Sequence, residues 1–212
     1  MCNILLGNFL ELLFDSEKII MTGGIVLIVL VVFFENGVIF TFFLPGDYLL
    51  FLSGLFCANG ILEIDITTLT LLIFFAALLG CFFGYYFGRR VGYTLYNRKE
   101  SRFFKKKYLE EAEKFFNKWG GRSIILSRFL PIVRTFVPVL AGIAKYRLKL
   151  FAFYTFAGVT LWVSSLVLGG YFLGQEFPQL KNYIHYIIAG FLLVTTITLI
   201  KSWMVVRKQS RS

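Results

Sequence analysis

The sequence has few charged residues and few cysteines. Only 16% of its 212 residues are Asp, Glu, Lys or Arg, whereas 58% are hydrophobic, and this combination excludes an intrinsically disordered chain. The three cysteines, Cys2, Cys57 and Cys81, form no Cys-x-x-Cys pair and have no histidine at ligand spacing. They indicate neither a disulfide framework nor a metal site, and we interpret them as small apolar fillers.

What is abundant is apolar and aromatic. Aromatic residues make up 19% of the chain and the mean hydropathy is +0.74, values that predict an integral membrane protein. The net charge of +10 indicates basic loops on the cytoplasmic side of a membrane rather than binding to nucleic acid. The glycine-rich run at 84–88 lacks the Lys-Ser/Thr or Gly-x-Gly-x-x-Gly context of a nucleotide site.

The apolar runs predict an all-α membrane protein with single crossings and re-entrant helical hairpins. If 123–144 crossed fully, the basic residues of 145–149 and of the C-terminal tail would lie outside, against the positive-inside bias, so we expect it to enter and return. The expected parts are an N-terminal interfacial segment at 1–18 and, within one membrane domain at 19–212, spanning helices at about 19–36, 66–88, 148–174 and 183–206, hairpins at about 37–58 and 123–144, and a cytoplasmic amphipathic basic segment at 89–122.

The two halves of the chain resemble each other. At one constant offset, Phe-Leu-Pro at 43–45 aligns with Phe-Leu-Pro at 129–131, and the Gly-Tyr run at 84–88 aligns with the one at 170–174. Each unit is then a broken hairpin followed by one crossing, and together they predict an inverted repeat. The expected hairpin hinges are Pro45, Gly46 and Pro131, and the glycines at 80, 84, 88, 169, 170 and 174 predict close helix contacts.

Four ionisable residues stand out in the apolar segments: Glu35, Asp47, Arg128 and Arg134. An ionisable group at the bilayer centre costs roughly 2.5–3.5 kcal/mol even on the lenient insertion scale, so these four must pair, be hydrated or meet a charged ligand. One interpretation is a static set of ion pairs that joins the hairpins. The other is a transport site, because broken helices at membrane depth require a protein or aqueous surrounding.

Two arginines suit a phosphate group. Their planar guanidinium binds phosphate oxygens in a bidentate manner and stays charged, so Arg128 and Arg134 are candidates for binding an anionic lipid headgroup. Glu35 and Asp47 are candidates for ion coupling through H⁺ or Na⁺. We interpret Trp162 as helix packing, and we expect no cofactor and no metal.

Several motifs together resemble one known family. They are Glu35-Asn36, Pro45-Gly46-Asp47, the glycine-rich runs at 84–89 and 170–174, Phe115 to Gly120, Ser127 to Arg134, Ala141-Gly142 and Trp162. This set resembles the DedA family of bacterial membrane proteins, relatives of the eukaryotic VTT-domain lipid scramblases. The similarity covers roughly 35–174, and its most specific part is the Arg-Phe-x-Pro-x-x-Arg hairpin. The chain departs from the pattern at Cys81, where many relatives carry an acid.

The resemblance implies a fold with two facing re-entrant hairpins in the bacterial cytoplasmic (inner) membrane. It implies movement of undecaprenyl or another polyprenyl phosphate, or of another phospholipid, between leaflets, with dependence on the proton motive force. The family's required acids and arginines match Glu35, Asp47, Arg128 and Arg134.

Other functions remain as alternatives. A phosphatidylethanolamine flippase or scramblase, and a proton-coupled exporter of small cations or drugs, would both fit a small membrane protein with buried charges. A lipid phosphatase would need a histidine near the arginines, and His185 is the only histidine, so we expect no enzyme. A homodimer is left open, and a purely structural scaffold would tolerate substitution of all four charges.

Overall fold

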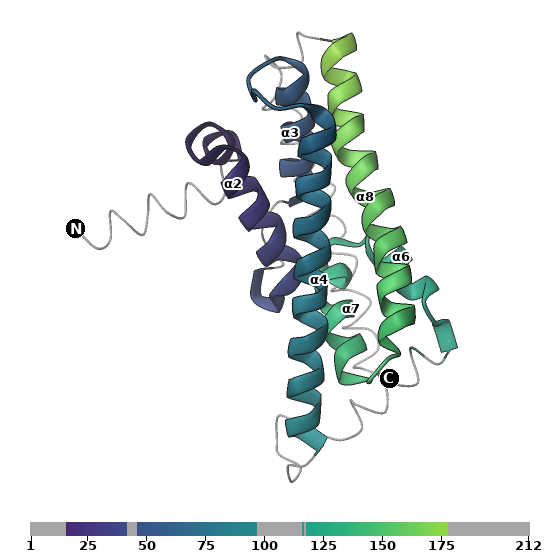
Figure 1. Cartoon of the computed structure of the whole chain (residues 1–212). Coiled ribbons are helices and arrows are strands. Elements are labelled where there is room, and N and C mark those ends of the chain that lie inside the picture. The colour runs from purple at the N-terminus through teal and green to yellow at the C-terminus, as the bar shows by residue number, and fades with distance from the viewer. Residues whose placement is uncertain (1–15, 42–45, 97–115, 117, 178–212) are drawn as a thin grey trace, which may run out of the picture.

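The computed structural model describes residues 16–41, 46–96, 116 and 118–177, and it is helical without strands over these ranges. The elements are α2 (Ser16–Gly37), the 3-10 turn η1 (Ile39–Thr41), α3 (Gly46–Ala58), α4 (Ile66–Tyr96), α6 (Arg122–Ser127), α7 (Pro131–Ile143) and α8 (Leu148–Glu176) (Figure 1). The all-α prediction is confirmed there. The predicted crossing at 183–206, the hinge Pro45, His185 and most of the segments at 1–18 and 89–122 lie outside the described residues.

Two helices are long and apolar enough to cross a bilayer among the residues described. They cover Ile66–Gly92, with 27 residues and a hydropathy of 2.4, and Leu148–Glu176, with 29 residues and a hydropathy of 1.7. At about 1.5 Å per residue, each is longer than the hydrocarbon core, which is about 30 Å thick. Helix α4 continues to Tyr96, so the first part of the expected basic segment extends the crossing helix instead of leaving it at Arg89.

Local chemistry explains where two helices begin or bend. Oδ2 of Asp65 accepts hydrogen bonds from the backbone amides of Thr67 at 2.9 Å and Thr68 at 3.3 Å, and so caps the start of α4. The Thr67 side chain and these amides also lower the pKa of Asp65. Helix α2 contains Gly24 at φ 53° and ψ −147°, a conformation open to glycine, so the helix expected over 19–36 is kinked there.

The short helices α3 and α7 lie toward opposite ends of the long pair α4 and α8 (Figure 1). Helix α3 leads into α4, yet its most extensive packing is against α8; α7 leads into α8, yet packs most extensively against α4. The two short helices begin close to each other, since Asp47 in the first turn of α3 contacts Arg134 in the first turn of α7. Each short helix therefore runs outward from a shared central region.

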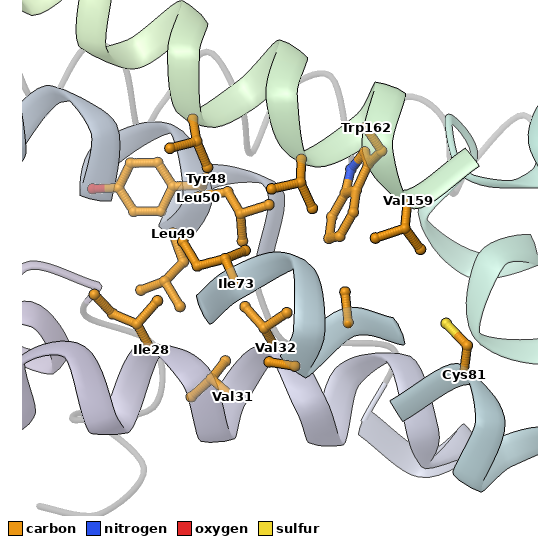
Figure 2. Packing of buried hydrophobic residues seen from close by; sticks show 14 of the residues in the cluster. Ile28, Val31, Val32, Tyr48, Leu49, Leu50, Ile73, Cys81, Val159 and Trp162 are labelled. Atoms are coloured by element: carbon orange, nitrogen blue, oxygen red, sulfur yellow. The ribbon is translucent and has the colours of Figure 1, made fainter. Parts of the chain in front are cut away.

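The apolar core lies between these helices, and it is built from branched and aromatic side chains. Figure 2 shows buried side chains of α2, α3, α4 and α8 that belong to one cluster, namely Ile28, Val31 and Val32, Tyr48, Leu49 and Leu50, Ile73, and Val159 and Trp162. All of these are buried. Because lipid tails are as apolar as these side chains, close packing rather than the hydrophobic effect must hold the helices together.

Glycines provide that close packing where backbones meet. A Cβ on Gly170 of α8 would overlap the Phe51 carbonyl oxygen of α3 and lie 3.0 Å from its carbonyl carbon. Equivalent overlaps arise for Gly88 against the Val139 carbonyl and for Gly142 against the Tyr85 carbonyl, between α4 and α7. The predicted close contacts are thus present at five of the six glycines, namely Gly80, Gly84, Gly88, Gly170 and Gly174. Gly169 has no described atom within 4 Å of such a Cβ.

Two adjacent glycines of α8 give a matched test of this packing. We expect Gly170→Ala to destabilise the protein by about 1–3 kcal/mol, because the added methyl group forces α3 and α8 apart. Gly169→Ala meets open space among the described residues and should change stability by less than about 1 kcal/mol. Thermal unfolding of both variants in detergent measures the difference, and equal melting temperatures would contradict the packing argument.

Candidate functional site

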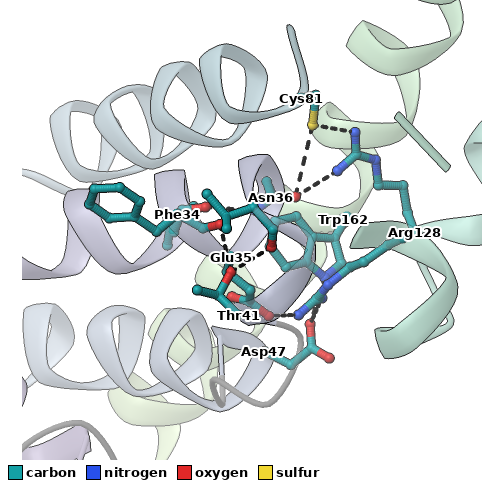
Figure 3. A network of polar contacts seen from close by, with 11 residues as sticks. Phe34, Glu35, Asn36, Thr41, Asp47, Cys81, Arg128 and Trp162 are labelled. Atoms are coloured by element: carbon teal, nitrogen blue, oxygen red, sulfur yellow. Dashed lines mark hydrogen bonds and ion pairs between the residues drawn. The ribbon is translucent and has the colours of Figure 1, made fainter. Parts of the chain in front are cut away.

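The four ionisable residues predicted from the sequence lie near the starts of α3 and α7. Glu35 comes from α2, Asp47 from α3, Arg128 from the C-cap of α6 and Arg134 from α7. Three of them are almost completely buried, with exposed fractions of 1% for Glu35 and 2% for each arginine, while Asp47 is 26% exposed. Their hydrogen bonds divide them into two neighbouring groups, and Figure 3 shows Arg128 beside Asn36 and Cys81, apart from Asp47.

Arg134 is the centre of the first group. Its guanidinium donates hydrogen bonds to Oε1 of Glu35 and to Oδ1 of Asp47, so one cation is paired with two carboxylates. Trp162 of α8 donates from Nε1 to the same Asp47 oxygen at 2.8 Å, and its ring centre lies 4.6 Å from the guanidinium carbon of Arg134. Four helices, α2, α3, α7 and α8, are joined by this group.

Helix geometry brings these side chains together. Pro131 is suited to the first position of α7 because it lacks the amide hydrogen that this position leaves unbonded, and it sets Arg134 within the first turn. Asp47 occupies the first turn of α3, where a carboxylate is favoured by the helix dipole. The ion pair therefore connects two helix starts.

Gly46 makes room for Glu35. A Cβ on Gly46, the first residue of α3, would overlap Oε2 of Glu35, and no hydrogen-bond partner reaches that oxygen within the described part of the chain. The sequence predicts Gly46 as a hinge. The structure adds a steric reason for glycine at this position, independent of any special backbone conformation.

Arg128 is the centre of the second group, and its partners are neutral. It donates from Nη1 to Oδ1 of Asn36 at 2.8 Å and from Nη2 to Sγ of Cys81 at 2.7 Å. Asn36 in turn donates from Nδ2 to the Val32 carbonyl at 2.8 Å. Gly158 of α8 leaves space for the arginine stem, since a Cβ there would lie 3.2 Å from its Cγ. No carboxylate pairs with Arg128 among the residues described.

Sequence reasoning missed three contributors to these groups. Cys81 is buried in the apolar core, as its interpretation as an apolar filler predicts, but its sulfur also accepts a hydrogen bond from the Arg128 guanidinium. Trp162 packs between helices as expected, but it also hydrogen-bonds Asp47 and faces Arg134. Asn36 has no predicted role, although an amide directly after Glu35 in an apolar segment is a usable signal in the sequence. The described residues contain no group of three or more His, Cys, Asp or Glu that could hold a metal ion.

Comparison with known proteins shows the family of this chain. A family model described as the VTT domain matches residues 44–172, a range that includes every residue of the two groups except Glu35 and Asn36. The chain is also similar to the protein DedA of Escherichia coli K12, with 36% identity over 166 residues that cover 78% of this chain and 75% of DedA. The chain belongs to the DedA family.

Other relatives extend the same result. This DedA-family chain is 40% identical to an uncharacterized membrane protein of Mycobacterium leprae over 183 residues, which cover 86% of the chain and 81% of the relative. It is 32% identical to the inner membrane protein YqjA of Escherichia coli K12 over 170 residues, or 80% of the chain and 76% of YqjA. No solved structure matches the chain.

Proposed function

We propose that this protein moves a phosphate-bearing lipid, undecaprenyl or another polyprenyl phosphate, between the leaflets of the bacterial inner membrane. The observation that carries the proposal is the pair of buried arginines, one free of any carboxylate partner among the described residues and one held by two acids. Buried guanidinium groups bind phosphate oxygens strongly when water is excluded. A lipid substrate needs a polar path only for its headgroup.

We propose that the fold is an inverted repeat of two re-entrant hairpins, each followed by a crossing helix. The first hairpin would comprise η1 and α3, and the second α6 and α7. The crosswise packing of α3 on α8 and of α7 on α4 supports this proposal, as does the meeting of the α3 and α7 starts in the centre. Alternating access to a central site is the usual role of this architecture.

In the proposed mechanism the acids control the availability of Arg134. Uptake of H⁺, or binding of Na⁺, by Glu35 or Asp47 weakens the ion pairs and frees the guanidinium for the headgroup. The lipid chain stays in the bilayer beside the exposed apolar surfaces of α4 and α8. The proton motive force then drives reorientation, and no covalent chemistry is involved, so the protein is not an enzyme.

The proposal also includes a membrane topology, and other substrates compete with polyprenyl phosphate. The basic segment 89–122 and the C-terminus are placed on the cytoplasmic side. A phosphatidylethanolamine flippase or scramblase uses the same arginines on a different headgroup. An exporter of small cations or drugs depends on Glu35 and Asp47 alone, and the neutral surroundings of Arg128 favour an anionic substrate over that one.

Leaflet-resolved transfer in liposomes tests the proposal directly. Purified protein is reconstituted with labelled polyprenyl phosphate or labelled phosphatidylethanolamine, with and without an imposed pH gradient. We expect Arg128→Ala to reduce transfer of the anionic lipid at least about thirtyfold, because a buried charged hydrogen-bonding partner is worth on the order of 2–5 kcal/mol. Arg122→Ala is the matched control, since this exposed arginine begins the same helix α6.

The outcomes separate the candidates. Full transfer by Arg128→Ala would reject the assigned headgroup site. Movement of phosphatidylethanolamine but not of polyprenyl phosphate would name the alternative lipid. Absence of lipid movement together with gradient-dependent cation efflux would establish the exporter.

A further inference from the structure

We infer that Arg128 is the docking point of the anionic headgroup, and that Asn36 and Cys81 determine its affinity by holding the guanidinium without neutralising it. This inference rests on the proposed function and assigns the two arginines different roles. Arg128 receives the anion, whereas Arg134 is available only after one of its acids has been released.

The two groups differ in charge. Glu35, Asp47 and Arg134 together carry a formal charge of −1 when ionised, while Arg128 with Asn36 and Cys81 carries +1. A phosphate that approached Arg134 would displace a carboxylate and meet the repulsion of the other. The same phosphate at Arg128 meets a cation that no carboxylate of the described residues contacts, and burial of a charge without a direct counter-ion is costly until an anion arrives.

The Arg128 guanidinium retains hydrogen-bonding capacity for an anion. A guanidinium has five N–H donors, and the contacts to Asn36 and Cys81 account for two of them. A phosphate oxygen is a far stronger acceptor for such donors than a thiol sulfur. The Cys81 contact is therefore the one that a headgroup replaces at least cost.

The Arg128 guanidinium is already held in place. Asn36 is fixed by its bond to the Val32 carbonyl of its own helix, and Cys81 is fully buried on α4. The stem of Arg128 lies against Gly158 on α8, where any larger side chain would crowd it. Contacts from three helices pre-organise the group, which reduces the entropy lost when an anion binds.

Substitutions that place an acidic side chain next to Arg128 test this inference directly. Cys81→Asp would place a carboxylate against Nη2, and Asn36→Asp would place one against Nη1 with almost no change of volume. Cys81→Asn is the matched control, because it has the size of aspartate without its charge. The full-length protein is placed in phosphatidylcholine nanodiscs, and binding of dodecyl phosphate and of inorganic phosphate is measured by titration calorimetry.

We expect wild type to bind dodecyl phosphate, Cys81→Asp to bind it at least tenfold more weakly than Cys81→Asn, and Asn36→Asp to bind it at least tenfold more weakly than wild type. Asn36→Asp keeps the test decisive should Cys81→Asp fail to fold. If the acidic variants bind as well as the neutral proteins, the docking role of Arg128 is wrong while the lipid proposal survives. Failure of wild type to bind dodecyl phosphate would overturn both. If wild type binds inorganic phosphate as tightly as dodecyl phosphate, the anion site stands, but a lipid is rejected as the source of the bound phosphate group.

Discussion

Replacing Arg134 by alanine should destabilise the folded protein by about 3–5 kcal/mol and abolish lipid transfer. The loss of stability follows because Glu35 and Asp47 would be left beside each other without the cation that both contact, and Glu35 is buried. The cation–π contact with Trp162 is lost as well. Unfolding in denaturant and leaflet-resolved transfer, measured on the same preparation, check the two parts of this expectation.

A second substitution separates stability from function. The double variant Arg134→Ala/Glu35→Gln removes one stranded charge, so it should regain part of the lost stability without regaining transfer. Arg134→Lys keeps the charge but loses the planar fork, and we expect it to fold and to transfer slowly. Arg134→Ala with the stability of wild type would show that the two acids do not need this cation in the folded state.

Replacing Gly46 by alanine should reduce transfer at least tenfold and lower stability by about 1–3 kcal/mol or more. The added methyl group would occupy the position of Oε2 of Glu35, so either the carboxylate leaves Arg134 or the start of α3 moves. Both responses disturb the contact between the starts of α3 and α7. Melting temperature and transfer rate are the measurements.

Shortening Glu35 provides the matching rescue. In Gly46→Ala/Glu35→Asp the acid is one methylene shorter, which leaves room for the new methyl group, and stability should recover relative to Gly46→Ala alone. The recovery identifies the steric contact as the cause. If the loss of stability in the double variant equals the sum of the losses in the two single variants, the alanine acts instead through the backbone of α3.

The charged residues of the site were predictable because of their cost in a membrane. Glu35, Asp47, Arg128 and Arg134 interrupt apolar segments where an ionisable group must be paired or liganded, and the structure places all four within the two neighbouring groups. Their roles in transport stay a prediction.

The partners of these residues were not predictable in the same way. A cysteine and a tryptophan are common inside apolar helices, so nothing in their sequence context marks Cys81 or Trp162 as contacts of an arginine or of its acids. Their importance depends on which faces of α4 and α8 turn toward α6 and α7. That choice is made by packing between segments far apart in the chain.

The sequence by itself determined that this is a helical membrane protein of the DedA family and which of its residues carry charge into the apolar segments, because hydropathy, charge and motifs are properties of the chain. Only the tertiary structure decided that Arg134 is paired with two carboxylates and that Arg128, among the described residues, is paired with none. It likewise decided that Gly170 and not Gly169 meets a neighbouring backbone. The reason is physical: a pairing depends on distances of a few ångströms between helices, and those distances arise only when the helices pack.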